Sequence, residues 1–180
     1  MKQVVLIHGK DRTSRDLWYP WISSELAKRG VRCIIPDINH ETVPKIREWL
    51  EAIDNLHPDK ETILVGHSRG GMAILRWLET PGRAISKAIL VATNSALIAD
   101  DAGGDFYSGP FDFDTIRSNC QDFRLLHSED DQWVPYQAAL ENAAGLNAKV
   151  LTYNDRGHFT RQQNGSPLTE FPDLLHEILN

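Results

Sequence analysis

The chain has 180 residues, of which 41% are hydrophobic and 24% charged, and its formal net charge at pH 7 is −6. These values predict one soluble globular domain and exclude a disordered chain, while the acidic excess disfavours nucleic acid as a partner, because a phosphate backbone is normally bound by a basic face. No stretch has the length and apolarity of a secretory signal or a membrane span, and two isolated cysteines make neither a disulfide framework nor a zinc site, so we expect a cytoplasmic protein without a membrane partner.

The first half of the chain alternates short apolar runs with amphipathic stretches. β-Branched residues are frequent in the runs, as in strands that are buried on both faces of a parallel sheet. Helices are predicted where apolar residues recur every three to four positions, with Gly30 as a C-cap and Thr42 as an N-cap. In chain order the prediction is strand Val4–Ile7, helix 16–29, strand Arg32–Ile35, helix 42–53 and strand Thr62–Val65.

The second half continues this alternation to the C-terminus. Its predicted elements are a helix from Ser68 to Leu78, strand Lys87–Val91, strand Phe123–Leu126, helix 135–145, strand Lys149–Tyr153 and helix 168–179. Six strands separated by helices predict an α/β fold with a parallel sheet. Right-handed crossovers then place helices on both faces of that sheet.

One segment, residues 93–122, is too long for an ordinary connection between two strands. It is rich in glycine and aromatic residues, and a short helix is predicted at 114–120. Ligands of open α/β sheets bind beyond the carboxyl ends of the strands, where this segment should lie. Two interpretations stay open, a partial lid over a site and a packed surface loop.

The strongest local signal is the pentapeptide Gly66-His67-Ser68-Arg69-Gly70, which has the pattern G-x-S-x-G. It follows a predicted buried strand and opens a predicted helix, the context that a nucleophile elbow requires. The sharp turn raises the serine hydroxyl above the sheet edge, and the glycines avoid collisions with neighbouring backbone. Ser68 is therefore the candidate nucleophile, with a structural glycine turn as the alternative.

A serine nucleophile needs an acid and a histidine, which follow it in that order in sites of this type. Both occur directly after later predicted strands. Three adjacent acids, residues 129–131, follow the strand Phe123–Leu126, and His158 follows the strand Lys149–Tyr153. An imidazole can accept the serine proton and return it to a leaving group, while a carboxylate fixes the imidazole tautomer.

The oxyanion that forms when a serine adds to a carbonyl needs hydrogen-bond donors. The elbow supplies the backbone N–H of Arg69. The loop that holds His8-Gly9 supplies the N–H of Lys10, unless His8-Gly9 is a mere turn. No spacing of metal ligands is present in the sequence, so neither a metal nor a cofactor is expected.

These segments together resemble the small α/β-hydrolases similar to retinoblastoma-binding protein 9 and their bacterial relatives. The resemblance spans nearly the whole chain and rests on His8-Gly9, Trp18-Tyr19-Pro20-Trp21, the pentapeptide at 66–70, the insertion from Phe106 to Cys120, the segment Asp130 to Pro135, and Gly157-His158-Phe159. It implies a compact α/β-hydrolase fold over residues 1–180 and a catalytic triad of Ser68, Asp131 and His158. Asp131 is chosen because the family's acid is followed by two residues and then Val-Pro.

Binding to the retinoblastoma protein is attributed to the founding member of that family and depends on an L-x-C-x-E stretch. The corresponding place here, residues 56–60, is Leu-His-Pro-Asp-Lys and lacks both the cysteine and the glutamate. We therefore do not expect retinoblastoma-protein binding.

The sequence thus predicts a serine hydrolase that cleaves a small carboxylic ester, thioester or amide through an acyl-serine intermediate. Candidates for an apolar acyl pocket are Trp18, Phe106, Phe111 and Trp133, each with core packing as its alternative. A binding or scaffold protein that keeps the fold with little turnover is the competing class, because one fold hosts many functions. A dehalogenase or epoxide hydrolase would carry a carboxylate in place of Ser68.

Overall fold

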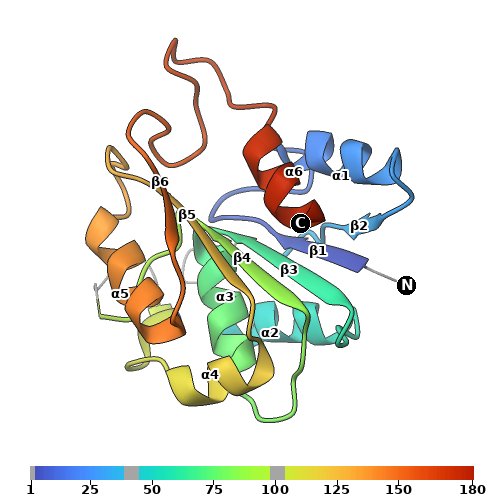
Figure 1. Cartoon of the computed structure of the whole chain (residues 1–180), viewed down its shortest axis with the longest axis vertical. Coiled ribbons are helices and arrows are strands. Elements are labelled where there is room, and N and C mark those ends of the chain that lie inside the picture. The colour runs from blue at the N-terminus through green and yellow to red at the C-terminus, as the bar shows by residue number, and fades with distance from the viewer. Residues whose placement is uncertain (1–2, 39–44, 98–103) are drawn as a thin grey trace.

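Six parallel strands form one sheet with the order β2-β1-β3-β4-β5-β6 in the computed structural model, which describes residues 3–38, 45–97 and 104–180 (Figure 1). The strands are β1 (Gln3–Ile7), β2 (Arg32–Ile34), β3 (Thr62–His67), β4 (Lys87–Val91), β5 (Phe123–Ser128) and β6 (Val150–Tyr153). All six predicted strands are confirmed, each to within two residues. Apolar runs locate them well because a parallel sheet is covered on both faces.

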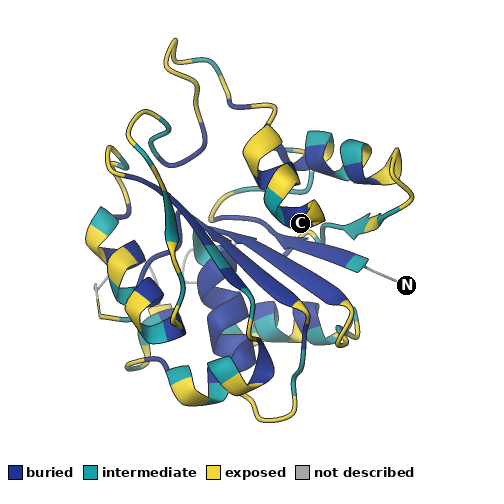
Figure 2. Ribbon diagram, in the orientation of Figure 1, coloured by how far each residue is buried: buried dark blue, intermediate teal, exposed yellow. Residues whose placement is uncertain are grey.

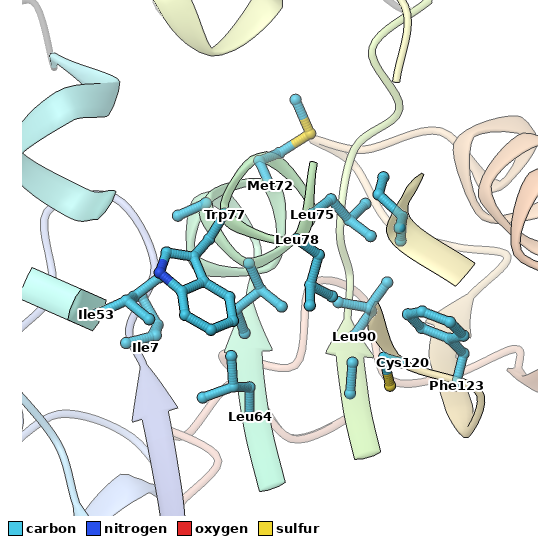
Figure 3. Packing of buried hydrophobic residues seen from close by; sticks show 14 of the residues in the cluster. Ile7, Ile53, Leu64, Met72, Leu75, Trp77, Leu78, Leu90, Cys120 and Phe123 are labelled. Atoms are coloured by element: carbon cyan, nitrogen blue, oxygen red, sulfur yellow. The ribbon is translucent and has the colours of Figure 1, made fainter. Parts of the chain in front are cut away.

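Alternate side chains of each strand enter two separate cores. On one face, residues such as Val5, Leu64 and Leu90 pack against α2 (Ile46–Asp54), α3 (Arg69–Leu78), α4 (Phe113–Asn119) and α5 (Tyr136–Leu146). Figure 3 shows Trp77 and Leu78 of α3 lying over β3 and β4 in this core. On the other face, α1 (Tyr19–Ala27) and α6 (Pro172–Leu179) cover the sheet, and the four inner strands, β1, β3, β4 and β5, are largely buried (Figure 2). Helices on both faces are therefore confirmed.

Two helices begin later than predicted because local turns precede them. Before α1, the Thr13 backbone N–H and hydroxyl both donate to the Asp16 carboxylate, at 2.6 and 3.0 Å. These bonds close a turn over residues 13–16, and the positive φ of Leu17, 54°, then keeps the helix from starting before Tyr19. Before α6, the Leu168 N–H donates to the Thr160 carbonyl at 3.0 Å, and the helix starts at Pro172. Proline suits a first helical turn because its missing N–H is not needed there.

Two other helix ends also differ from the prediction. The predicted N-cap Thr42 lies outside the described residues, and α2 begins at Ile46. Helix α5 continues past Gly145 to Leu146 and is capped by Asn147 in the left-handed conformation. Gly145 instead permits close packing of α4 on α5, because a Cβ there would lie 2.4 Å from the Phe113 ring.

The described part of the 93–122 segment is anchored to α3. It contains a 3₁₀ turn, η1 (Gly104–Tyr107), and α4, which confirms the predicted short helix. Arg76 of α3 is buried, and its guanidinium donates to the carbonyls of Phe106 and Gly109 at 3.0 and 2.5 Å. The same guanidinium lies 4.4 Å from the centre of the Phe111 ring. Arg76 therefore fastens the 3₁₀ turn and the residues after it to α3.

Two further predictions concern membrane spans and cysteines. Within residues 3–38, 45–97 and 104–180, no helix combines the length and apolarity needed to cross a bilayer. Cys33 and Cys120 are both free thiols. Burial raises the pKa of each to about 11, so both stay protonated and unreactive near neutral pH.

Candidate active site

Ser68 occupies a strained turn between β3 and α3. Its φ of 54° and ψ of −118° lie in a region that residues with a side chain rarely adopt. The Ser68 N–H donates to the Val91 carbonyl at 2.8 Å, which extends the β3–β4 ladder into the turn. The strand-to-helix geometry expected of an elbow is therefore present at the carboxyl edge of the sheet.

Glycines around Ser68 allow backbone segments to meet without side chains between them. A Cβ at Gly66 would lie 2.5 Å from Gly71 Cα, and a Cβ at Gly70 would lie 2.2 Å from the Ile7 carbonyl oxygen. A Cβ at Gly71 would lie 1.9 Å from Thr93 Oγ1. Helix α3 thus starts directly against the ends of β1, β3 and β4. The motif indicated the first two glycines, whereas the requirement at Gly71 comes from the distant residue Thr93.

His158 and Asp131 form a hydrogen-bonded pair at the same edge of the sheet. The His158 Nδ1–H donates to Asp131 Oδ2 at 2.7 Å. The other carboxylate oxygen, Oδ1, accepts from the N–H groups of Trp133 and Val134 at 2.9 and 3.0 Å. Because a carboxylate can only accept, the proton of the neutral imidazole is on Nδ1, and Nε2 is the basic nitrogen.

The Asp131 side chain is fully buried yet remains ionised. Burial alone would raise its pKa, but the hydrogen bond from His158, the His158 charge and the two backbone N–H donors together hold the pKa below its ordinary value. An ionised carboxylate at this place can stabilise an imidazolium on His158.

Glu129 and Asp130, the other two acids of the loop, are exposed. Asp130 also makes hydrogen bonds with the surrounding loops. Its Oδ1 accepts from the Ser128 hydroxyl at 2.5 Å and from the Gly157 N–H at 2.9 Å. Asp130 therefore joins the loop after β5 to the loop that carries His158, and these hydrogen bonds lower its pKa.

A cavity of about 510 Å³ contains the candidate residues. Ser68 and His158 line it together with Lys10 and Arg69, the two residues whose N–H groups were predicted as oxyanion donors. Within the part of the chain that the structure describes, no group of three or more histidine, cysteine or acidic side chains could hold a metal ion. The cavity thus joins residues that follow β1, β3, β4, β5 and β6 at one edge of the sheet.

Two of the four aromatic residues predicted for the pocket do line this cavity. Phe106 lies in its wall, and Trp133 is 64% exposed at its rim, with its ring centre 5.0 Å from that of His158 in an edge-to-face arrangement. The other two are corrected, because they do not line the cavity. Trp18 is fully buried, its indole N–H donating to the Phe159 carbonyl at 3.0 Å, and Phe111 packs on Arg76.

Met72, which the sequence analysis missed, also lines the cavity, and so does Tyr107, one of the aromatic residues of the 93–122 segment. Met72 could have been found, because a residue four positions after Ser68 lies on the same face of the helix that Ser68 opens. Whether Tyr107 reaches the cavity depends on how the 3₁₀ turn packs against the rest of the fold, and the sequence pattern does not determine that packing.

Two buried histidines other than His158 are kept neutral in the folded protein. Burial, followed by the charge of His158, lowers the pKa of His67 to about 3. Burial also lowers the pKa of His127, whose Nε2–H donates to the Val134 carbonyl at 3.0 Å. Both rings have their hydrogen-bonding partners inside the fold rather than in water.

We expect the buried His67 to make the protein less stable in acid. An unfolded histidine gains a proton as the pH falls through about 6.5, whereas folded His67 stays neutral, so each pH unit below 6.5 costs about 1.4 kcal/mol of unfolding free energy. His67→Gln cannot titrate, and its stability deficit relative to wild type should therefore shrink by about 2 kcal/mol between pH 8 and pH 5. Urea unfolding at both pH values measures this difference. A deficit that is the same at both would contradict a neutral buried His67.

A parallel sheet of this order, with a serine in a strained strand-to-helix turn and a histidine–aspartate pair on later loops at the same edge, defines an α/β-hydrolase. The match to a family model makes the assignment more specific. The chain belongs to the Serine hydrolase family, whose model matches residues 4–177. It is therefore a hydrolase, and the predicted family and fold are both confirmed.

Individual relatives agree with this family. The chain is 30% identical over 165 residues to "Serine hydrolase RBBP9" of Rattus norvegicus, with 89% of this chain and 84% of the relative covered. It is 30% identical over 181 residues to "Putative hydrolase YdeN" of Bacillus subtilis, with coverage of 97% and 94%. The crystal structure of that B. subtilis protein matches with a TM-score of 0.86 over 99% of both chains, at 29% identity. Mouse alpha/beta hydrolase domain-containing protein 10, at 16% identity, shares the fold with a TM-score of 0.69, over 98% of this chain and 86% of its own.

Proposed function

We propose that Ser68, His158 and Asp131 are a catalytic triad that hydrolyses a small carboxylic ester, thioester or amide through an acyl-serine intermediate. One observation carries the proposal. The strained Ser68 shares a cavity with a histidine whose Nδ1 is bonded to a buried, ionised aspartate. This arrangement leaves His158 Nε2 to accept a proton from a hydroxyl in the cavity.

The chemistry proceeds in two halves. His158 Nε2 takes the Ser68 proton as Oγ attacks the substrate carbonyl, and the N–H groups of Lys10 and Arg69 bind the resulting oxyanion. When the tetrahedral intermediate collapses, the imidazolium gives its proton to the leaving alcohol, thiol or amine, and the acyl group remains on Oγ. Water then repeats the sequence, which releases the acid and restores the serine hydroxyl.

The cavity favours a small acyl group with apolar character. Met72 and Phe106 supply apolar surface beside Ser68, and the exposed ring of Trp133 flanks His158 at the rim. At about 510 Å³ the space is within the usual range for small-molecule sites. The 3₁₀ turn of the 93–122 segment forms part of the cavity wall, and we propose that this turn is the partial lid. The lid and the triad would then belong to a single hydrolase domain.

A fluorophosphonate probe tests this function, because such probes react with activated serines. We expect wild-type protein to be labelled, and we expect short-chain p-nitrophenyl esters, thioesters and aminoacyl amides to compete in proportion to how well they are turned over. Labelling without turnover of any carbonyl substrate would favour a binding or scaffold protein. Absence of labelling would contradict the proposed nucleophile.

The wall residue Phe106 should determine which acyl chains are accepted. Phe106→Leu enlarges the cavity and should shift the ranking of kcat/KM for p-nitrophenyl esters toward longer chains, by about tenfold for one to two added methylenes. Phe111→Leu is the matched control, because Phe111 is buried on Arg76 outside the cavity. Kinetics on acetate to octanoate esters measure the ranking. An equal shift in both variants would show that the effect is not local to the cavity.

A further inference from the structure

His67, the residue directly before Ser68, has a side chain that the triad chemistry does not use. It is the last residue of β3 and only 1% exposed. Its ring lies 5.1 Å from the ring of His158 and 5.7 Å from that of Trp18. A buried imidazole between the elbow and the base must find all of its hydrogen-bonding partners inside the protein.

The hydrogen bonds of His67 fix its tautomer. Its Nε2 lies 2.9 Å from the His158 carbonyl oxygen, which can only accept, so Nε2 carries the proton. Its Nδ1 is then an acceptor, and the Tyr19 hydroxyl donates a hydrogen bond to it at 2.6 Å. The Tyr19 oxygen in turn accepts from the Gly9 N–H at 3.3 Å. One directed chain therefore runs from Gly9 through Tyr19 and His67 to the backbone of His158.

This chain joins three parts of the site that are far apart in the sequence. Gly9 begins the loop of the first proposed oxyanion donor, His67 adjoins the nucleophile, and His158 is the proposed base. Packing supports the same link, because a Cβ at Gly9 would lie 3.3 Å from His67 Nδ1 and 3.4 Å from Ser68 Cβ. The oxyanion loop thus lies directly against the elbow, and a Cβ at Gly9 would be in tight contact with it.

We propose that His67 is a positioning residue, which together with Tyr19 holds the oxyanion loop and the base in register with Ser68. The inference rests on the proposed triad and adds the hydrogen bonds that align the nucleophile, the base and the oxyanion loop. A neutral ring is required, because a charged His67 would repel the imidazolium that forms on His158 during turnover. The charges that act on His67 are those of His158, Asp131 and Arg12 on the surrounding loops, and Tyr19 of α1 faces it as a neutral hydrogen-bond donor.

Variants that break this series of hydrogen bonds at different points test the positioning role. His67→Asn is too short to reach the His158 carbonyl, whereas His67→Gln can place an amide N–H near the position of Nε2. We expect His67→Asn to lower kcat for p-nitrophenyl acetate by 10- to 100-fold at nearly unchanged KM, as for other residues that orient catalytic groups. His67→Gln should recover about tenfold of that loss, and Tyr19→Phe should lower kcat by about tenfold. Tyr136→Phe, which loses only a surface contact to Thr152, is the control.

The proposal is overturned if Tyr19→Phe and the His67 variants keep kcat within twofold of wild type, or if Gln at position 67 is as impaired as Asn. Nitrogen-15 NMR of histidine-labelled wild type gives a test that needs no variant to fold. We expect His67 to carry its proton on Nε2 and not to titrate from pH 9 to 5, and the Nδ1–H tautomer would overturn the proposal. The NMR result also stands apart from the triad assignment, which is tested separately by the labelling of Ser68 and by the kinetics of the Ser68 and Asp131 variants.

Discussion

Replacing Ser68 by alanine should abolish ester hydrolysis, with a loss of about 10⁶ in kcat, because no other group can form the acyl intermediate. The fold should persist. Alanine removes one oxygen atom, and the backbone hydrogen bond from residue 68 to the Val91 carbonyl does not involve the side chain. Serine and alanine both carry a Cβ, so the strain of the positive φ at residue 68 is the same in both proteins. The melting temperature should therefore stay close to that of wild type.

The measurement is kcat for p-nitrophenyl acetate, with circular dichroism as the check on folding. Ser118→Ala is a suitable control, because this exposed serine of α4 donates to the Thr115 carbonyl, does not line the cavity and is not proposed to react. Ester turnover by Ser68→Ala at the wild-type rate would contradict the assignment of the nucleophile.

Replacing Asp131 by asparagine should have the second largest effect, a loss of about 10³ to 10⁴ in kcat. Asparagine can keep one oxygen toward the N–H groups of Trp133 and Val134, which turns its NH₂ group toward His158. That NH₂ can only donate, so Nδ1 of His158 must become an acceptor and the proton moves to Nε2. The imidazole then lacks the basic nitrogen that faces the cavity, and its cationic form also loses a buried counter-charge.

The neighbouring acids provide matched controls for this variant. Asp130→Asn keeps an oxygen that can accept from the Ser128 hydroxyl and the Gly157 N–H, and Glu129→Gln changes only an exposed side chain. Both should stay within about tenfold of wild type, because solvated charges are strongly screened. Measuring kcat for the three variants shows which of the three acids orients His158. A crippled Asp130→Asn beside an active Asp131→Asn would assign the acid to position 130.

Local patterns predicted the fold because burial in a covered parallel sheet leaves its mark on the composition of each strand. A run such as Lys87–Val91 is buried on both faces and therefore reads as apolar without reference to its neighbours. Helix starts were less accurate. The turn closed by Thr13 and Asp16 competes with the first turn of α1, and an amphipathic pattern does not register that competition.

The candidate site was predicted where spacing along the chain determines it. The order serine, acid, histidine and the position of Asp131 before Val134-Pro135 were sufficient to select three residues that the fold brings to one edge. Depth of burial was not predictable in this way. Trp18 and Phe106 look alike as aromatic residues near motifs, yet Trp18 belongs to the core under α1 and Phe106 reaches the cavity.

The network around His67 depends on contacts between distant residues. Its partners Tyr19 and His158 are 48 and 91 positions away in the sequence, and only the docking of α1 and of the loop after β6 on the elbow brings the three together. A histidine within a G-x-S-x-G motif carries no such information by itself. The same holds for Asp130, whose contact with Gly157 spans 27 positions.

Peptide mass spectrometry after fluorophosphonate labelling tests the central claim most directly. Trypsin releases the elbow as the peptide from Glu61 to Arg69, in which Ser68 is the sole serine, so an adduct on that serine is unambiguous. We expect one probe molecule per chain, attached to Ser68, formed slowly in Asp131→Asn and absent from the elbow peptide of Ser68→Ala. An adduct on a different serine, or ester hydrolysis that continues while the elbow peptide stays unmodified, would contradict the account.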